Sequence, residues 1–294
     1  MLALDCDCQY SGPFVVKVVR TIPAIRRLCG RTRERVVLVP TMGALHAGHA
    51  ALIARARRMA GAHGIVVVSI FVNPTQFGPM EDLSRYPRPF AADRRLCEEH
   101  GGDVVFYPSV KEMYPAGFST FVEEQVVSSA LCGTSRPGHF RGVCTVVLKL
   151  FTIIEPDIAV FGQKDFQQCA VIRRVVRDLN LPVRIAAMPT VRDRDGLALS
   201  SRNAYLTPEE RAQAPVIRRA LRAARDAWRS GEKRSARLRQ IVARQIARAP
   251  LAKVDYIDVV DADSIQPVAE TCNKALIASA VFFGKTRLID NIVL

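Results

Sequence analysis

The sequence predicts an α/β protein that combines a doubly wound parallel sheet with a second, smaller α+β domain. Between residues 35 and 189, short apolar runs alternate with helix-like segments. The runs are apolar on both faces, which is typical of parallel strands covered by helices on each side. After Thr190 the pattern changes to basic helices followed by two further strands.

The individual elements follow from these patterns. We expect strands at 36–39, 65–72, 103–107, 158–161 and 183–187, and helices at 47–59, 91–100 and 166–179. A Rossmann-like sheet of this kind binds ligands beyond the carboxyl ends of its strands. The turn signal at 193–196 separates a ligand-binding domain, residues 1–190, from a C-terminal α+β lid domain, residues 191–294. In the lid we expect a capped helix start at 207–210 and strands at 254–260 and 275–283.

Composition narrows the class of protein. No apolar stretch approaches the ~20 residues that a membrane-spanning helix needs, and the N-terminus does not resemble a secretory signal. We therefore expect a cytoplasmic protein. Eight cysteines without a C-x-x-C pair indicate free thiols, and the acidic and cysteine residues at 5–8 are interpreted as a tail rather than a metal site.

The net charge of +14 raises the alternative of an RNA-binding protein. Segment 211–248 contains twelve basic and two acidic residues, but Ile217, Leu221, Ala224 and Trp228 recur on one helix face. The arginines then occupy the solvated side of an amphipathic helix, and no aromatic residues interleave with them to stack on bases. Nucleic acid is therefore the less favoured partner.

The most informative motif is P-T-M-G-A-L-H-A-G-H at 40–49, where an apolar strand gives way to a helix. Gly43 and Gly48 let a nucleotide approach the backbone, and the helix N-terminus offers N–H groups to phosphates. His46 and His49 can point the same way and stabilise charge as pyrophosphate departs. A zinc site is the rival interpretation, but no further ligands occur at suitable spacing, so we expect no protein-bound metal.

Two segments that follow other expected strands supply further polar groups. In F-V-N-P-T-Q-F at 71–77, the amide of Gln76 can bind a hydroxyl or carboxylate of a small substrate. In F-G-Q-K-D-F-Q-Q at 161–168, the glycine allows close approach, the lysine can meet a phosphate, and the aspartate suits a helix N-cap. The second glutamine of that segment lies one turn on and faces the same crevice.

A fourth segment, G-L-A-L-S-S-R-N at 196–203, lies at the domain junction. Its two serines and its arginine can hold β- and γ-phosphates as a second domain closes. A turn before the helix that starts near Thr207 is the simpler interpretation of the same residues, and both can hold because the phosphate-binding residues precede the helix.

Together these motifs resemble the pantoate–β-alanine ligase family, within the H-x-G-H nucleotidylyltransferase superfamily. S-R-P-G-H-F-R-G-V at 135–143 and R-L-I-D-N at 287–291 extend the resemblance, which runs from about Val36 to Asn291 in the same order. It implies a ligase in which pantoate attacks ATP to give pantoyl-adenylate and pyrophosphate. β-Alanine then attacks the acyl carbon, releasing AMP and pantothenate, the precursor of coenzyme A. Magnesium with the ATP, and a homodimer, are also implied.

The resemblance also assigns residues. It implies ATP contacts for Met42, Gly43, Ala44, Leu45, His46, Ala47, Gly48, His49, Gly162, Gln163, Lys164, Asp165, Val191, Leu199, Ser200, Ser201 and Arg202. It implies catalytic roles for His46, His49, Lys164, Ser200, Ser201 and Arg202. It also implies that pantoate contacts Gln76 and Gln168 and that β-alanine lies near Gln76. The family usually assigns His49 as a general acid, whereas we favour charge stabilisation by both histidines. His139 and Arg141 are expected near the site or a dimer contact.

Two departures from the family pattern occur. Thr75 stands where methionine is common, beside the expected pantoate-binding glutamine, and Gln163 replaces a common glutamate. A nucleotidylyltransferase that transfers AMP to a phosphate acceptor is the main alternative enzyme. It would share the H-x-G-H motif but lack the two neutral glutamines as substrate binders.

Overall fold

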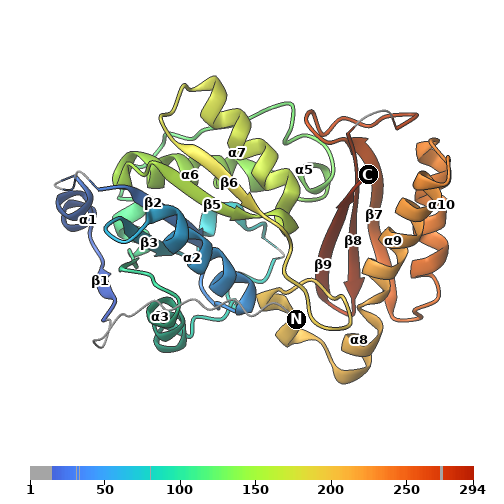
Figure 1. The fold of residues 1–294 in the computed structure, drawn as a ribbon, viewed down its shortest axis with the longest axis horizontal. Coiled ribbons are helices and arrows are strands. Elements are labelled where there is room, and N and C mark those ends of the chain that lie inside the picture. The colour runs from blue at the N-terminus through green and yellow to red at the C-terminus, as the bar shows by residue number, and fades with distance from the viewer. Residues whose placement is uncertain (1–14, 31, 33, 80, 272–273) are drawn as a thin grey trace.

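Figure 1 shows the fold of the chain as a computed structural model, which describes residues 15–30, 32, 34–79, 81–271 and 274–294. The acidic tail at 5–8 and three of the eight cysteines lie outside these residues. The described cysteines are free thiols, as expected, at Cys29, Cys97, Cys132, Cys144 and Cys169. No helix within the described ranges is long and apolar enough to cross a membrane.

The larger of two sheets has six parallel strands in the order β1-β4-β3-β2-β5-β6. In chain order they are β1 (Lys17–Val19), β2 (Val36–Thr41), β3 (Ile65–Ile70), β4 (Val104–Phe106), β5 (Ile158–Gly162) and β6 (Arg184–Met188). The central strand β2 pairs with β3 and β5 on its two sides. Because all six strands run the same way, their carboxyl ends form a single edge.

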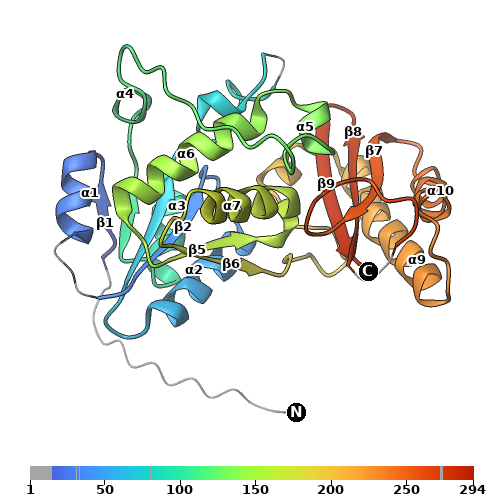
Figure 2. The ribbon, with the colours of Figure 1, turned by 90° about the horizontal axis from the view of Figure 1, so that it is seen from above.

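Helices cover both faces of this sheet (Figure 2). One face carries α2 (Ala47–Ala60) and α3 (Phe90–Glu99), and the other carries α1 (Ile22–Cys29), α6 (His139–Ile154) and α7 (Phe166–Asp178). Alternate residues of β2 enter the two cores, since Val39 packs with Ile53 of α2 whereas Leu38 lies in the cluster of α6 and α7. Burial on both faces explains the continuous apolar runs of the sequence.

The smaller sheet is antiparallel and consists of β7 (Ala252–Asp261), β8 (Ala275–Phe283) and β9 (Thr286–Val293). After α8 (Pro208–Gln213), helices α9 (Val216–Arg229) and α10 (Ser235–Ile246) cover one of its faces. Leu221 of α9 is fully buried while Arg219 and Arg222 are exposed, which confirms the amphipathic basic helix. On the other face, Leu276 joins the core cluster that contains Phe161 of β5, so the two sheets share a core.

Short turns complete the fold and bring loop residues to the edge of the larger sheet. They are α4 (Val110–Met113), α5 (Cys132–Ser135), and the 3₁₀ turns η1 (Pro74–Gln76), η2 (Gln163–Asp165) and η3 (Ser201–Tyr205). η1 lies against α6 at Gly142, where any Cβ would collide with the backbone of Thr75.

The predicted fold class is confirmed, and most expected elements end within two residues of the observed ones. β2 continues through Pro40, which pairs with Ser69 rather than ending the strand. β1, α1, α6 and β9 were not among the expected elements. The capping box of Thr207 and Glu210 begins α8 as expected. The division into domains at residues 190 and 191 stays a prediction.

One ion pair fixes the connection between the sheets. Arg192 follows β6 and binds both carboxylate oxygens of Asp290 in β9, at 2.7 and 2.8 Å. The aspartate side chain is only 4% exposed. Removing one partner of a buried pair leaves an uncompensated charge, which is costly.

We therefore expect Asp290→Asn to lower the free energy of unfolding by about 3 kcal/mol, measured by urea denaturation. The matched control is Asp178→Asn, which breaks a pair with Arg177 whose side chains are 48% and 67% exposed. The control should cost less than about 0.5 kcal/mol. Equal losses in the two variants would contradict the assignment.

Candidate active site

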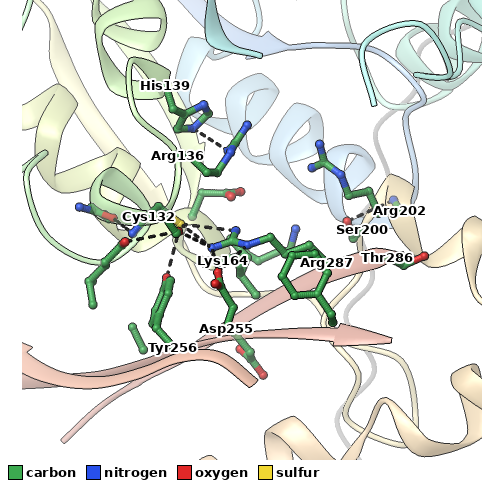
Figure 3. A pocket seen from close by; sticks show the side chains of 18 of the residues that line it. Cys132, Arg136, His139, Lys164, Ser200, Arg202, Asp255, Tyr256, Thr286 and Arg287 are labelled. Carbon is green, nitrogen blue, oxygen red and sulfur yellow. Dashed lines mark hydrogen bonds and ion pairs between the residues drawn. The ribbon is translucent and has the colours of Figure 1, made fainter. Parts of the chain in front are cut away.

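Four segments expected to bind ligands converge at the carboxyl edge of the larger sheet. They enclose a cavity of about 230 Å³. Fourteen of the residues expected in the site line it: Met42, His46, Gly48, His49, Gln76, Gly162, Lys164, Asp165, Gln168, Val191, Leu199, Ser200, Ser201 and Arg202. A second cavity of about 660 Å³ adjoins it between the two sheets and shares Lys164, Ser200 and Arg202 (Figure 3).

The remaining expected residues surround the cavity without lining it. Gly43 lines a separate cavity of about 490 Å³ behind the motif, and Ala44 and Leu45 connect it to His46. Ala47 is the first residue of α2. The backbone carbonyl of Gln163 accepts a hydrogen bond from Asn291.

Both histidines of the H-x-G-H motif cap α2. Nδ1 of His46 accepts the backbone N–H of Gly48 at 3.1 Å, and Nδ1 of His49 accepts the N–H of His46 at 3.3 Å. With Nδ1 accepting, a neutral imidazole carries its proton on Nε2. A Cβ at Gly48 would lie 2.8 Å from the His46 ring, so glycine makes room for that ring. Because Nδ1 of each ring accepts a backbone N–H, Nε2–H is the hydrogen-bond donor of both rings.

The histidines are neutral near pH 7. Burial, followed by the charge of Lys164, lowers the pKa of His46 from 6.5 to about 4. Burial lowers the pKa of His49 to about 3, with His46 and Lys164 acting in the same direction. A pKa this low makes either residue a hydrogen-bond donor rather than a proton donor at neutral pH.

Asn73 sets the orientation of the Gln76 amide. Nδ2 of Asn73 donates to Oε1 of Gln76 at 3.1 Å, which leaves Nε2 of Gln76 directed to Sδ of Met42 at 2.9 Å. Gln76 is 8% exposed and lines the cavity. It therefore presents an N–H donor to an oxygen-bearing ligand.

Thr75 does not line the cavity. Its hydroxyl donates to Oδ1 of Asn73 at 2.9 Å, and the same oxygen accepts the hydroxyl of Tyr114 at 2.8 Å. The side chain that replaces the family's methionine thus bears on the site through Asn73, which binds Gln76.

Two residues of the S-R-P-G-H-F-R-G segment donate hydrogen bonds to the backbone carbonyl of Gln76. Nδ1 of His139 donates to the carbonyl of Gln76 at 2.9 Å, and Arg136, which donates to that carbonyl at 3.3 Å, binds Glu81 at 2.6 and 2.7 Å. Burial and Arg136 lower the pKa of His139 to about 4. Arg141 lies elsewhere, over the ring of Phe121 at 4.0 Å.

The turn before α7 brings Lys164 to the junction of the two cavities. Asn291 of β9 donates to the carbonyls of Gln163 and Lys164 at 3.0 and 2.9 Å, so the smaller sheet holds this turn. Asp165 occupies the N-cap position but makes no capping hydrogen bond, so the expected capping role is wrong. Because it is not used as a cap, its carboxylate remains on the cavity wall.

Gln167 and Gln168, which follow this turn, have different contacts. Gln168 lines both cavities, as expected. Gln167 is buried and donates to the carbonyls of Val127 and Ala130 while accepting the N–H of Cys132. It thereby holds the chain around α5, which forms part of the wall of the larger cavity.

The S-S-R residues meet the loop after β3. Arg202 binds Asp82 through two hydrogen bonds of 2.8 and 3.1 Å, and the hydroxyls of Ser201 and Tyr86 lie 3.3 Å apart. Burial opposes ionisation of Asp82, but Arg202 outweighs it and lowers the pKa of the carboxyl. Sequence reasoning missed Asn73, Asp82, Tyr86 and Arg136, of which Asn73 and Arg136 lie within the quoted motifs.

The described residues contain no group of three His, Cys, Asp or Glu side chains suited to a metal ion. Asp82 and Asp165 are among the carboxylates that line the two cavities.

Known proteins resemble this chain along most of its length. The family model for pantoate-beta-alanine ligase matches residues 17–293. Pantothenate synthetase of Heliobacterium modesticaldum is 54% identical over 94% of this chain and 99% of that protein, and the Moorella thermoacetica enzyme is 50% identical over 95% and 99%.

Solved structures agree with these relatives. Pantothenate synthetase of Thermus thermophilus superposes with a TM-score of 0.90 at 46% identity, covering 94% of this chain and 99% of that one. Pantoate-beta-alanine ligase of Francisella tularensis, solved with beta-gamma ATP and beta-alanine, gives 0.78 at 34% identity, covering 95% and 97%.

The lowered histidine pKa values predict how stability depends on pH. Between those values and the ordinary 6.5, the unfolded chain binds more protons than the folded one. The free energy of unfolding should therefore fall as the pH is lowered from about 7 to about 5. His139→Gln removes one of three such groups and should reduce this slope by about a third. Urea denaturation at each pH tests this, and a pH-independent stability would contradict it.

Proposed function

The chain belongs to the pantoate–β-alanine ligase family, and we propose that the cavity at the carboxyl edge of its parallel sheet is the active site. The chain catalyses the ATP-dependent condensation of pantoate with β-alanine to pantothenate. The single observation that supports the site is that four segments distant in sequence, each expected to bind a ligand, converge on one cavity. The inferred path is adenylation of the pantoate carboxylate followed by attack of the β-alanine amine.

His46 and His49 would act on the first step as neutral donors. Their Nδ1 atoms are occupied by backbone N–H groups, so only Nε2–H is available to the phosphate oxygens. Negative charge grows on the bridging oxygen as pyrophosphate leaves, and fixed donors aimed at it lower the barrier without proton transfer. The low pKa values support this role over that of a general acid.

Lys164, Ser200, Ser201 and Arg202 would hold the phosphates. Lys164, Ser200 and Arg202 line both cavities and Ser201 lines the smaller one, which suits a triphosphate extending from the smaller space into the larger one. Arg202 is bound to Asp82, so a phosphate would compete with that carboxylate for the guanidinium. Its planar guanidinium suits either partner.

Gln76 and Gln168 would bind pantoate. The N–H donor of Gln76 fits a carboxylate or hydroxyl oxygen, and a neutral amide leaves the pantoate carboxylate free to act as the nucleophile. A charged partner there would stabilise the carboxylate before reaction. The amides therefore support a ligase over transfer of AMP to a phosphate acceptor.

Magnesium fits the site as a companion of ATP. When bound, it would neutralise part of the phosphate charge, with water and phosphate oxygens supplying most ligands. Asp82 and Asp165 are the carboxylates that could assist from the cavity wall.

Two further features are proposals on the same basis. Residues 1–190 would form the nucleotide- and pantoate-binding domain and 191–294 a lid, which contacts the first domain where Asn291 donates to the carbonyls of Gln163 and Lys164. The family resemblance also implies a homodimer in the cytoplasm, and sedimentation velocity would test the assembly.

The reaction is tested by ATP–pyrophosphate exchange with pantoate and magnesium but without β-alanine. We expect pantoate-dependent exchange, followed by stoichiometric AMP and pantothenate once β-alanine is added. Exchange that needs no pantoate, or none at all in folded protein, would argue against the proposed path.

The role of Lys164 predicts that Lys164→Ala slows exchange about a hundredfold or more, since one charged transition-state contact is lost. The control is Lys253→Ala, which removes an exposed lysine of β7 and should leave the rate within a factor of two. Near-normal exchange in Lys164→Ala would show that this lysine does not stabilise the transition state.

A further inference from the structure

The backbone between β2 and α2 adopts an unusual conformation just where ATP is expected to bind. Gly43 has a φ of 83° and Ala44 a φ of 50°. The left-handed region is open to glycine but costs an L-residue such as alanine roughly 1 kcal/mol. Two consecutive residues in this region need a specific interaction to hold them.

Cavities border part of this loop, so packing encloses it only partly. Met42 lines the cavities of about 230 and 490 Å³, and Gly43 lines the second of them. Gly43 itself is buried, and the hydroxyl of Thr41 accepts its N–H at 3.2 Å. The N–H groups of Ala44 and Leu45 have a different partner.

Asp93 of α3 fastens the loop. Its Oδ2 accepts the backbone N–H of Ala44 at 2.9 Å, and its Oδ1 accepts that of Leu45 at 2.7 Å. The residue is 2% exposed. Burial raises the pKa of its carboxyl, and the two N–H donors oppose that rise.

The carboxylate also fits the loop closely. A Cβ on Gly43 would lie 3.0 Å from Oδ2 of Asp93 and 3.1 Å from the side chain of Ile70. Two consecutive N–H groups around one anion form a backbone anion site of the kind that binds phosphate in other proteins. Here the chain's own carboxylate occupies it, which leaves the N-terminus of α2 and the two imidazoles to face the ligand.

We propose that Asp93 is a positioning residue for ATP, which holds residues 42–45 so that His46 and His49 face the nucleotide. The inference rests on the proposed function, because it names what fixes the geometry of that site. Asp93 acts on the reacting groups only indirectly, by binding the backbone of the loop.

The test compares Asp93→Asn with wild type in the pantoate-dependent exchange assay. An asparagine has nearly the same size, but only one of its two terminal atoms can accept an N–H. We expect the KM for ATP to rise about tenfold or more, the scale of one lost hydrogen bond to a charged group. The KM for pantoate should stay within about twofold, since Gln76 and Gln168 lie on other elements.

Asp103→Asn is the matched control. Asp103 is also partly buried, accepts the backbone N–H of Val66 at 2.6 Å and pairs with Arg57 at 2.7 Å, but it lies at the amino edge of the sheet. It should lose thermal stability while its KM for ATP stays unchanged. A selective rise in the KM for ATP in Asp93→Asn alone supports the inference.

An unchanged KM for ATP, or equal rises for ATP and pantoate, would overturn it. If Asp93→Asn does not fold, Asp93→Glu replaces it, because a displaced carboxylate keeps the charge but should still raise the KM for ATP. Wild-type exchange is measured first. Its absence refutes the proposed reaction, whereas its presence with a normal Asp93 variant refutes only the positioning role.

Discussion

At the start of α2, two imidazole nitrogens accept backbone N–H groups. This interaction determines which hydrogen-bonding groups the site can offer to a ligand. Most helices use a hydroxyl or a carboxylate for this purpose. Here His46 and His49 perform it, so each ring is fixed in orientation and in tautomer. Burial beside Lys164 keeps both rings neutral. A structural cap and a set of oriented donors are therefore the same two side chains.

The smaller sheet forms part of the wall of the cavity of about 660 Å³, and it also places residues that line the cavity of about 230 Å³. Asn291 holds the turn that carries Lys164, and Asp290 holds Arg192 in the connection that leads to the serines and Arg202. Arg202 in turn reaches across to Asp82 on the loop after β3. The groups proposed to hold the phosphates thus depend on contacts between the two sheets, although the H-x-G-H motif itself belongs to the larger sheet.

Local sequence pattern predicted most of the fold because parallel strands and amphipathic helices have distinct periodicities. α6 was missed because it is buried on most of its surface, which removes the helical periodicity, and β1 is only three residues long. The motif residues were predictable from their types and spacing at strand ends. Asp82, Asp93 and Arg136 were not, because they act through contacts with residues 49 to 120 positions away.

The contacts of Asn291 also bear on the order of folding. They join residues 127 and 128 positions apart, and a contact of such long range closes a large loop of chain. Strands β2 and β3 pair across a much shorter separation, so the unit of β2, α2 and β3 can form while the turn at 163–164 still lacks its partner. A folding intermediate with only this unit would possess the histidine cap but no fixed lysine. The ability to activate a carboxylate would then appear only after the smaller sheet has formed.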